Sequence, residues 1–244
     1  RLPFWLTYWL ADYVIYKAPY MERMLKINKG KKSGWMLPNA VRLPDRVNTH
    51  RSDKCHFLFL NSLAPMRYPE IALDAFLELC QEMKLTSRSN IRMNIVGFLG
   101  DKAPKAVADK EASIRIRIAN QDLPIELHQW TTEPNRWFDD ADVFLLPADV
   151  VFPNYSLLEA MSLSVPPIVQ DSNGSDLIVT DEVDGYILPP EVHRWKECML
   201  RLIEDVDLRK KMGDAARLKV KNGFSVDGYL EKYDRIYRSV SDRT

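Results

Sequence analysis

Residues 152–190 read FPNYSLLEAMSLSVPPIVQDSNGSDLIVTDEVDGYILPP, and this stretch is the most informative part of the chain. It contains an apolar helix pattern with one acidic residue, Glu159, near its start, followed by an apolar strand pattern, PPIVQD. A polar turn, NGSD, then opens another helix. Because backbone N–H groups at the start of a helix attract anions, this stretch predicts a site for anions and sugar hydroxyls.

Strand-like and helix-like segments alternate from Lys54 onward. Strands that are apolar throughout and separated by helices indicate a parallel sheet covered on both faces. We therefore predict an α/β fold, a Rossmann-like doubly wound parallel sheet, whose ligands bind beyond the carboxyl ends of the strands. The predicted strands are 55–63, 92–98, 125–130, 142–148, 166–171 and 185–190; the predicted helices are 69–84, 106–121, 135–141, 156–164, 175–179, 192–206, 208–222 and 225–240.

Composition excludes some classes of function. The chain has 244 residues, with 34 Lys and Arg against 34 Asp and Glu, so no overall charge gathers nucleic acid. Its 3 cysteines lie far apart without a CxxC pair, which predicts neither disulfides nor zinc. We expect a cytoplasmic protein without a bound metal.

The first 25 residues are rich in aromatic side chains and contain no run of the ~20 apolar residues that a membrane span needs. Two interpretations stay open. The segment ends a preceding domain, or its aromatic residues form a surface that lies peripherally on a membrane. We assign residues 1–45 to a remnant of, or linker from, an N-terminal domain, with residues 26–34 as an exposed linker, and residues 46–244 to the predicted Rossmann-like domain.

Three loops beyond predicted strands carry candidate site residues. In the first, NSLAPMRYPE, Arg67 offers a guanidinium for phosphate close to a helix start. In the second, Ser156 is the expected N-cap of the next helix, and Glu159 either closes a capping box or accepts hydrogen bonds from a ribose diol. In the third, Asn173 and Gly174 suit a tight turn with positive φ, and Ser175 or Asp176 is expected to cap the helix that follows.

Other motifs are absent. None of the four histidines lies beside a serine or cysteine in a recognisable nucleophile arrangement. His128 alone is placed by the pattern near the cleft, although a core or surface position is expected for it. The sequence contains neither GxGxxG nor GxxxxGK[ST], which disfavours ordinary dinucleotide and P-loop chemistry.

The motifs PNAV (38–41), NIVG (94–97), ADVFLLP (141–147), the block 152–169, NGSD, DGYILPP (184–190) and NGFS (222–225) occur in one order. This order resembles the nucleotide-sugar-binding half of the GT-B glycosyltransferases, and most closely their large fourth family, over about residues 11–240. The resemblance implies a nucleotide diphosphate sugar donor, UDP-sugar or GDP-sugar, with no metal cofactor.

The resemblance also implies roles for individual residues. Arg67 and Glu159 would be catalytic: Arg67 faces the diphosphate and stabilises its departure, and Glu159 holds the ribose. Backbone N–H groups of Leu157 and Leu158 would bind the phosphates, and the base would rest near Trp130 and Thr131. The further substrate-binding residues that it implies are Ser62, Val151, Phe152, Asn154, Tyr155 and Ser156.

Three departures from the family pattern alter these expectations. The family's glutamate eight positions before Glu159 falls at Val151 here, or at Val150 with a shift of one residue. The family's Gly-Arg pair falls at Ser62, which leaves Arg67 as the only basic residue for the diphosphate. The acceptor-binding domain is represented only by a strand, ADYVI, and a helix, APYMERML. Because Val151 beside Phe152 forms an apolar wall, we hypothesise a 6-deoxyhexose donor such as rhamnose.

The leading hypothesis is a hexosyltransferase that acts on a glycan or glycoconjugate acceptor. The main alternative is a non-catalytic or partner-dependent nucleotide-sugar-binding module, in which another domain or chain supplies the acceptor half. A third interpretation, a sugar-nucleotide epimerase of related fold, requires a catalytic histidine and acidic residues that the sequence does not place.

Overall fold

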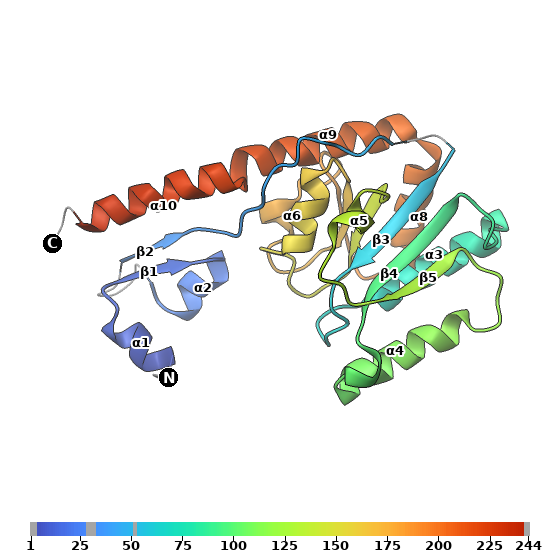
Figure 1. Cartoon of the computed structure of the whole chain (residues 1–244), viewed down its shortest axis with the longest axis horizontal. Coiled ribbons are helices and arrows are strands. Elements are labelled where there is room, and N and C mark those ends of the chain that lie inside the picture. Colours follow the sequence, from blue (N-terminus) through green and yellow to red (C-terminus); the bar gives the residue numbers. More distant parts are fainter. Residues whose placement is uncertain (1–3, 28–32, 51–52, 242–244) are drawn as a thin grey trace.

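The computed structural model describes residues 4–27, 33–50 and 53–241. Its centre is a parallel sheet of six strands in the order β5-β4-β3-β6-β7-β8 (Figure 1). The predicted α/β class and doubly wound parallel sheet are confirmed. The strands are β3 (Cys55–Leu60), β4 (Ile91–Phe98), β5 (Ile125–Gln129), β6 (Val143–Leu146), β7 (Pro167–Gln170) and β8 (Tyr186–Leu188).

Helices cover both faces of the sheet, because successive side chains of its central strands are buried on opposite sides. Phe57 and Phe59 pack into one core with α3 (Pro69–Met83), α4 (Lys105–Ile118) and α8 (Val192–Glu204). Leu58 packs into the other core with α6 (Tyr155–Ser162) and α9 (Val206–Gly223). The short elements between strands are η1 (Gly100–Lys102), α5 (Asn135–Phe138) and α7 (Ser175–Ile178).

The order of strands places a crevice at the centre of the sheet. The chain runs outward from β3 through β4 to β5, and then returns to the other side of β3 with β6, β7 and β8. The loops after β3 and β6 therefore diverge at neighbouring carboxyl ends. Such a switch point is where doubly wound sheets bind ligands.

The N-terminal segment forms a separate small sheet (Figure 1), and its Ala18 is buried in the core that contains Leu58 and Phe152. It forms α1 (Phe4–Leu10), β1 (Tyr13–Tyr16), α2 (Pro19–Met24) and β2 (Ser33–Met36), and β1 pairs in parallel with β2. The predicted strand ADYVI and helix APYMERML correspond to β1 and α2. The predicted linker 26–34 is wrong at its end, since Ser33 and Gly34 begin β2, while its residues 28–32 lie outside the described residues.

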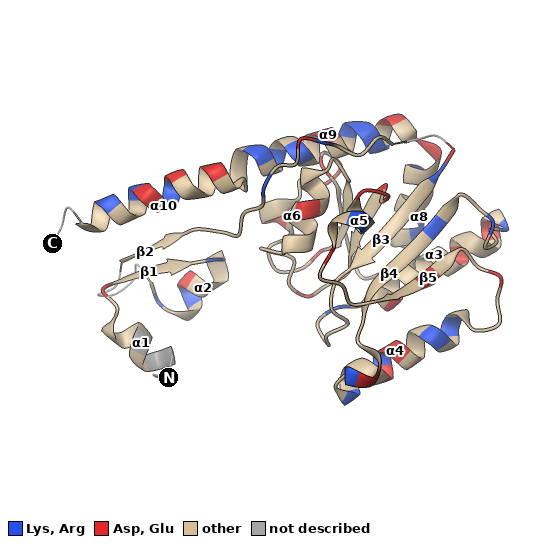
Figure 2. Cartoon of the chain, in the orientation of Figure 1, with Lys and Arg blue, Asp and Glu red and all other residues tan. Residues whose placement is uncertain are grey.

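The last helix, α10 (Val226–Ser241), extends from α9 toward this N-terminal segment (Figure 1). Lys17 donates a hydrogen bond to the Tyr229 hydroxyl, 3.2 Å away, and so links the two. Charges of both signs occur along α4, α9 and α10 (Figure 2). In the described ranges no helix combines the length and the apolar character needed to cross a bilayer.

Candidate functional site

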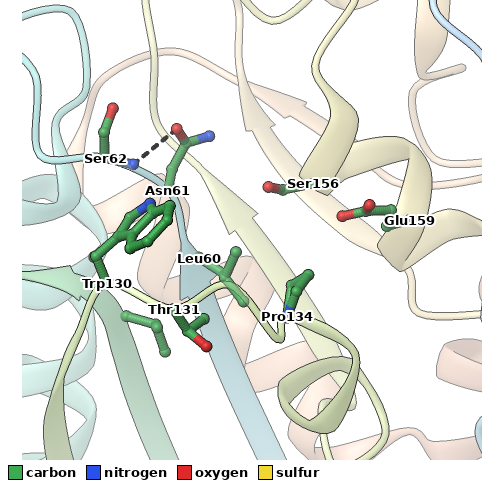
Figure 3. A pocket seen from close by; sticks show the side chains of 10 residues that line it. Leu60, Asn61, Ser62, Trp130, Thr131, Pro134, Ser156 and Glu159 are labelled. Carbon is green, nitrogen blue, oxygen red and sulfur yellow. Dashed lines mark hydrogen bonds between the residues drawn. The ribbon is translucent and has the colours of Figure 1, made fainter.

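A cleft of about 290 Å³ lies at the predicted place, beyond the carboxyl ends of β3, β4 and β5 and beside the first turns of α6 (Figure 3). In Figure 3 the side chains of Ser156 and Glu159 lie across the cleft from Asn61 and Trp130. The lining residues are Leu60, Asn61, Ser62, Val96, Gly97, Trp130, Thr131, Pro134, Ser156 and Glu159.

Gly97 allows the ends of β3 and β4 to approach each other at the cleft. Its φ is +141°, and a Cβ at this position would lie 1.9 Å from the carbonyl oxygen of Asn61. The Asn61 N–H in turn donates to the Val96 carbonyl at 3.2 Å. The Asn61 side chain accepts a hydrogen bond from the backbone N–H of Ser62 at 2.9 Å, which fixes the turn after β3. Side chains larger than glycine are therefore excluded from this position.

The start of α6 differs from the sequence-based expectation. Asn154, not Ser156, is the N-cap, and its Oδ1 accepts a hydrogen bond from the Leu157 N–H at 3.0 Å. The Leu158 N–H donates to the Asn154 carbonyl at 3.2 Å. The two N–H groups predicted to bind phosphate thus already have acceptors inside the protein, and both leucine side chains are fully buried.

The N–H groups of Tyr155 and Ser156 precede these and, within the described part of the chain, have no acceptor. The first N–H groups of a helix carry partial positive charge and need an external partner. Ser156 also lines the cleft. The open N–H groups at the start of α6 therefore belong to Tyr155 and Ser156, two residues earlier than expected.

Glu159 is half-buried, and burial raises the pKa of its carboxyl group above the ordinary value. No described residue donates a hydrogen bond to its carboxylate or forms an ion pair with it. With Asn154 as the cap, Glu159 lies beyond the position that a capping box uses, so that alternative is excluded. A carboxylate held in a cleft without a partner is available to a ligand. Glu159 also borders a second cavity of about 440 Å³, beside Arg42 and Arg46.

Arg67 does not line the cleft that Glu159 borders. Its Nη1 donates to the Val150 carbonyl at 3.4 Å, and its backbone pairs with Ala148. Burial lowers the pKa of the guanidinium, and the charge of Asp149 opposes this shift. The structure thus places Arg67 against the loop between β6 and α6, and its contact with a diphosphate stays a prediction.

Three other predicted residues line the cleft. Ser62 lies at the end of β3, and Trp130 and Thr131 follow β5. The Trp130 N–H donates to the Phe98 carbonyl at 2.8 Å, while 57% of the residue remains exposed. An exposed indole at the mouth of a polar cleft offers a flat apolar surface.

Val151 and Phe152 do not form the exposed apolar wall that we expected. Val151 is fully buried, and its N–H donates to the Asn173 carbonyl at 3.1 Å. Phe152 is 4% exposed, packs edge-on against Phe224, and borders a separate cavity of about 210 Å³. The wall assigned to Val151 is thus part of the core, and of the two residues only Phe152 reaches a cavity. Tyr155, by contrast, is exposed beside the second cavity that Glu159 borders.

The turn at 172–176 has its positive φ at Gly174, at +77°, as predicted. The N-cap of α7 is Gly174 itself, so the predicted caps Ser175 and Asp176 are wrong. The Ser175 hydroxyl donates instead to the Ser172 carbonyl at 3.0 Å. This turn supports the β6–α6 loop through Asn173.

His128 lies in a separate groove, where its Nε2 is 3.0 Å from Asn94 Oδ1 and its ring contacts Trp137. Burial lowers its pKa. Sequence reasoning missed Leu60, Asn61, Val96, Gly97 and Pro134 as lining residues, although their places at strand ends could have suggested them. No group of three metal-ligating side chains occurs in the ranges 4–27, 33–50 and 53–241.

The fold is a doubly wound α/β domain with a cleft at its switch point, and comparison with known proteins identifies its family. The family model described as "Glycosyl transferases group 1" matches residues 44–219, well over half of the chain. The chain therefore belongs to this glycosyltransferase family. The resemblance in the sequence motifs is confirmed.

Individual relatives align with all or part of this chain. A UDP-Gal:alpha-D-GlcNAc-diphosphoundecaprenol alpha-1,3-galactosyltransferase of Escherichia coli is 28% identical over 109 residues, which is 44% of this chain and 28% of that enzyme. The sucrose-phosphate synthase of Thermosynechococcus elongatus superposes with a TM-score of 0.79 at 16% identity, over 96% of this chain and 59% of that one. Anabaena Alr3699/HepE in complex with UDP and glucose gives 0.76 at 14% identity, over 96% and 65%. The chain thus spans less than a third of the curated relative, and the structural likenesses bear on fold alone.

Proposed function

We propose that this chain binds a nucleotide diphosphate sugar and acts as a glycosyltransferase that transfers the hexose to a glycan or glycoconjugate acceptor. Family membership and the cleft at the switch point of the sheet support the proposal. The observation that carries it is the Glu159 carboxylate, which borders the cleft without a protein partner. Two vicinal hydroxyls of a ribose are matched donors for such a carboxylate.

In this proposal the nucleotide lies along the cleft. The base rests against Trp130 and Thr131, the ribose donates to Glu159, and the diphosphate accepts hydrogen bonds from the N–H groups of Tyr155 and Ser156. Both the N-terminal end of α6 and the Arg67 guanidinium favour the negative charge that the diphosphate gains as the bond to the sugar breaks. In this proposal neither the binding of the diphosphate nor the stabilisation of its negative charge requires a metal ion. The E. coli relative is named for a UDP-Gal donor, and HepE was crystallised with UDP and glucose.

We retain the 6-deoxyhexose preference as a finer part of the proposal, now with Phe152 as the apolar residue. Phe152 borders the cavity beside the β6–α6 loop, and positions 150–151 supply no carboxylate there, although Asp176 also lines this cavity. Turnover of a 6-deoxyhexose donor and of its 6-hydroxy counterpart on the same nucleotide tests this preference. Faster turnover of the 6-hydroxy donor would end it.

A second candidate function is a nucleotide-sugar-binding module that needs another domain or chain for the reaction. Valine stands at 150 and 151, where the family pattern has a glutamate, and this favours the second candidate. It predicts donor binding without product formation, until the complementary domain is added. The first proposal predicts product from donor and acceptor with this chain alone.

The direct test of nucleotide binding is a thermal shift assay with UDP, GDP, ADP and TDP. A ligand at 100 times its Kd adds about 2.7 kcal/mol to the stability of the folded state. We expect a shift with at least one of them, its loss in Glu159→Ala and Arg67→Ala, and the parental shift in Glu231→Ala, an exposed carboxylate on α10. If both site variants respond like the parent, the assigned site is wrong.

A further inference from the structure

Two consecutive residues of α4, Lys110 and Glu111, contact the loops that follow two different strands. α4 runs below the ends of β4 and β5 (Figure 1). Lys110 reaches the loop after β3, and Glu111 reaches the loop after β4. Residues at the ends of both strands line the cleft, Asn61 and Ser62 after β3 and Val96 and Gly97 on β4.

The Lys110 ammonium is directed at backbone carbonyls. Its side chain is only 13% exposed, and Nζ donates to the carbonyls of Arg67 and, at 3.3 Å, Ala64. The Glu70 carboxylate is farther away, at 3.9 Å, and the Tyr68 ring centroid lies at 5.3 Å. A nearly buried ammonium needs such acceptors, so Lys110 fixes the turn 64–67 in place.

That turn is joined to the loop that leads into α6. The Tyr68 N–H donates to the Pro147 carbonyl at 2.9 Å, and the Asp149 N–H donates to the Met66 carbonyl at 3.2 Å. Arg67 Nη1 contacts the Val150 carbonyl. The position of Lys110 is thereby transmitted to Arg67 and to the start of α6.

Glu111 holds the loop after β4 in the same manner. It is 5% exposed, and its two carboxylate oxygens accept the N–H groups of Leu99 at 2.6 Å and Gly100 at 3.1 Å. The preceding residue, Phe98, accepts the N–H of Trp130, which lines the cleft. Hydrogen bonds from N–H groups to a buried carboxylate are among the stronger ones in proteins.

We propose that Lys110 and Glu111 are positioning residues that hold the loops after β3 and β4 in place and thereby set the affinity of the cleft for nucleoside diphosphates. The proposal rests on the proposed function. Neither side chain lines the cleft, so their effect on a nucleotide is transmitted through Arg67 and Trp130.

The test compares Lys110→Met, which keeps the aliphatic stem, with Lys110→Arg, which keeps a donor, and with Lys105→Met, an exposed lysine of the same helix. Isothermal titration with UDP and GDP gives the Kd, and hydrogen exchange reports on each segment. We expect Lys110→Met to weaken binding about tenfold, as loss of one charged hydrogen bond does. Lys110→Arg should keep most of the parental affinity, and Lys105→Met should keep all of it. In Lys110→Met, hydrogen exchange should rise at 61–68 and 147–152 alone.

Glu111→Gln tests the loop after β4, because an amide keeps one acceptor oxygen and places an NH₂ group against the other backbone donor. We expect weaker binding with faster exchange at 98–102. Unchanged Kd values in Lys110→Met and Glu111→Gln would overturn the proposal, as would faster exchange over the whole sheet, which indicates a general loss of stability. If the parent binds neither nucleotide, the proposed function fails, and local exchange still shows whether the two residues hold their loops.

Discussion

Glu159 combines two properties that oppose each other. Its carboxylate borders the cleft without a partner, which suits a ligand, and its burial disfavours the charged form. The free protein therefore keeps a group whose ionisation costs stability. Ionisable groups with a shifted pKa are concentrated at functional sites, where a group that binds a ligand lowers the stability of the free protein.

This opposition predicts how stability depends on pH. The folded-state pKa of Glu159 is raised above 4.5, so the stability linked to its neutral form is present below the unfolded-state pKa and is lost as pH rises through the folded-state pKa. Glu159→Gln lacks this loss. We expect the thermal midpoint of the variant to exceed that of the parent at pH 7, and the difference to shrink toward pH 4.

The same variant should bind the nucleotide more weakly, since an amide accepts one hydrogen bond from a diol less well than a carboxylate accepts two. Equal midpoints at pH 7, or a variant that is less stable there, would contradict the assignment of Glu159 as an unpaired buried acid.

The sequence pattern singles out Glu159, and the family resemblance implies Ser62, Trp130 and Thr131; all four line the cleft. The sequence could not fix the direction of a side chain within a loop. Val151 faces the core and Arg67 lies along the β6–α6 loop because of contacts with distant segments at Asn173 and Ala148. Such contacts leave no local pattern in the sequence.

At the level of elements, the start of α6 controls what the cleft offers to an anion. Ser156 and Asn154 are both good N-cap residues, and local preference alone does not choose between them. The turn that closes with the Asn154 N–H on the Val151 carbonyl, at 3.1 Å, makes Asn154 the cap. The open N–H groups accordingly belong to Tyr155 and Ser156.

Replacing the cap tests this assignment. We expect Asn154→Ala to lower the free energy of unfolding by about 1 kcal/mol, because the Leu157 N–H loses its acceptor. Urea titration measures the change. Asn154→Asp keeps an acceptor oxygen and should retain the parental midpoint, whereas Ser156→Ala should cost less than Asn154→Ala. A larger loss in Ser156→Ala would show that the cap is wrongly placed.

The contact between the ends of β3 and β4 gives a second prediction for an element. Gly97→Ala brings a methyl group against the Asn61 carbonyl and requires a φ that alanine rarely adopts. We expect a loss of about 3 kcal/mol, in the range of strained backbone positions and overpacked cores. Gly223→Ala, where a Cβ meets nothing within 4 Å, is the matched control.

Nucleotide binding should fall with Gly97→Ala even at temperatures where the variant stays folded, because the β3 loop must move. A Gly97→Ala protein with parental stability and parental affinity would show that the two strand ends are not packed as described.

At the scale of the whole molecule, the alternation of apolar strands and amphipathic helices was enough to predict the sheet and both covered faces. The separate two-stranded sheet of β1 and β2 was foreseen only as a strand and a helix, since its pairing joins segments across the residues 28–32. The balanced charge of 34 against 34 gives the whole molecule no net field that would attract anions.

The central claim is that the cleft between the loops after β3, β4 and β5 and the start of α6 binds a nucleoside diphosphate. The most direct measurement is a crystal structure of the chain grown with UDP or GDP. It should show the ribose about 3 Å from the Glu159 carboxylate and the diphosphate at the N–H groups of Tyr155 and Ser156. Nucleotide density at another place, with this cleft occupied only by water, would contradict the account.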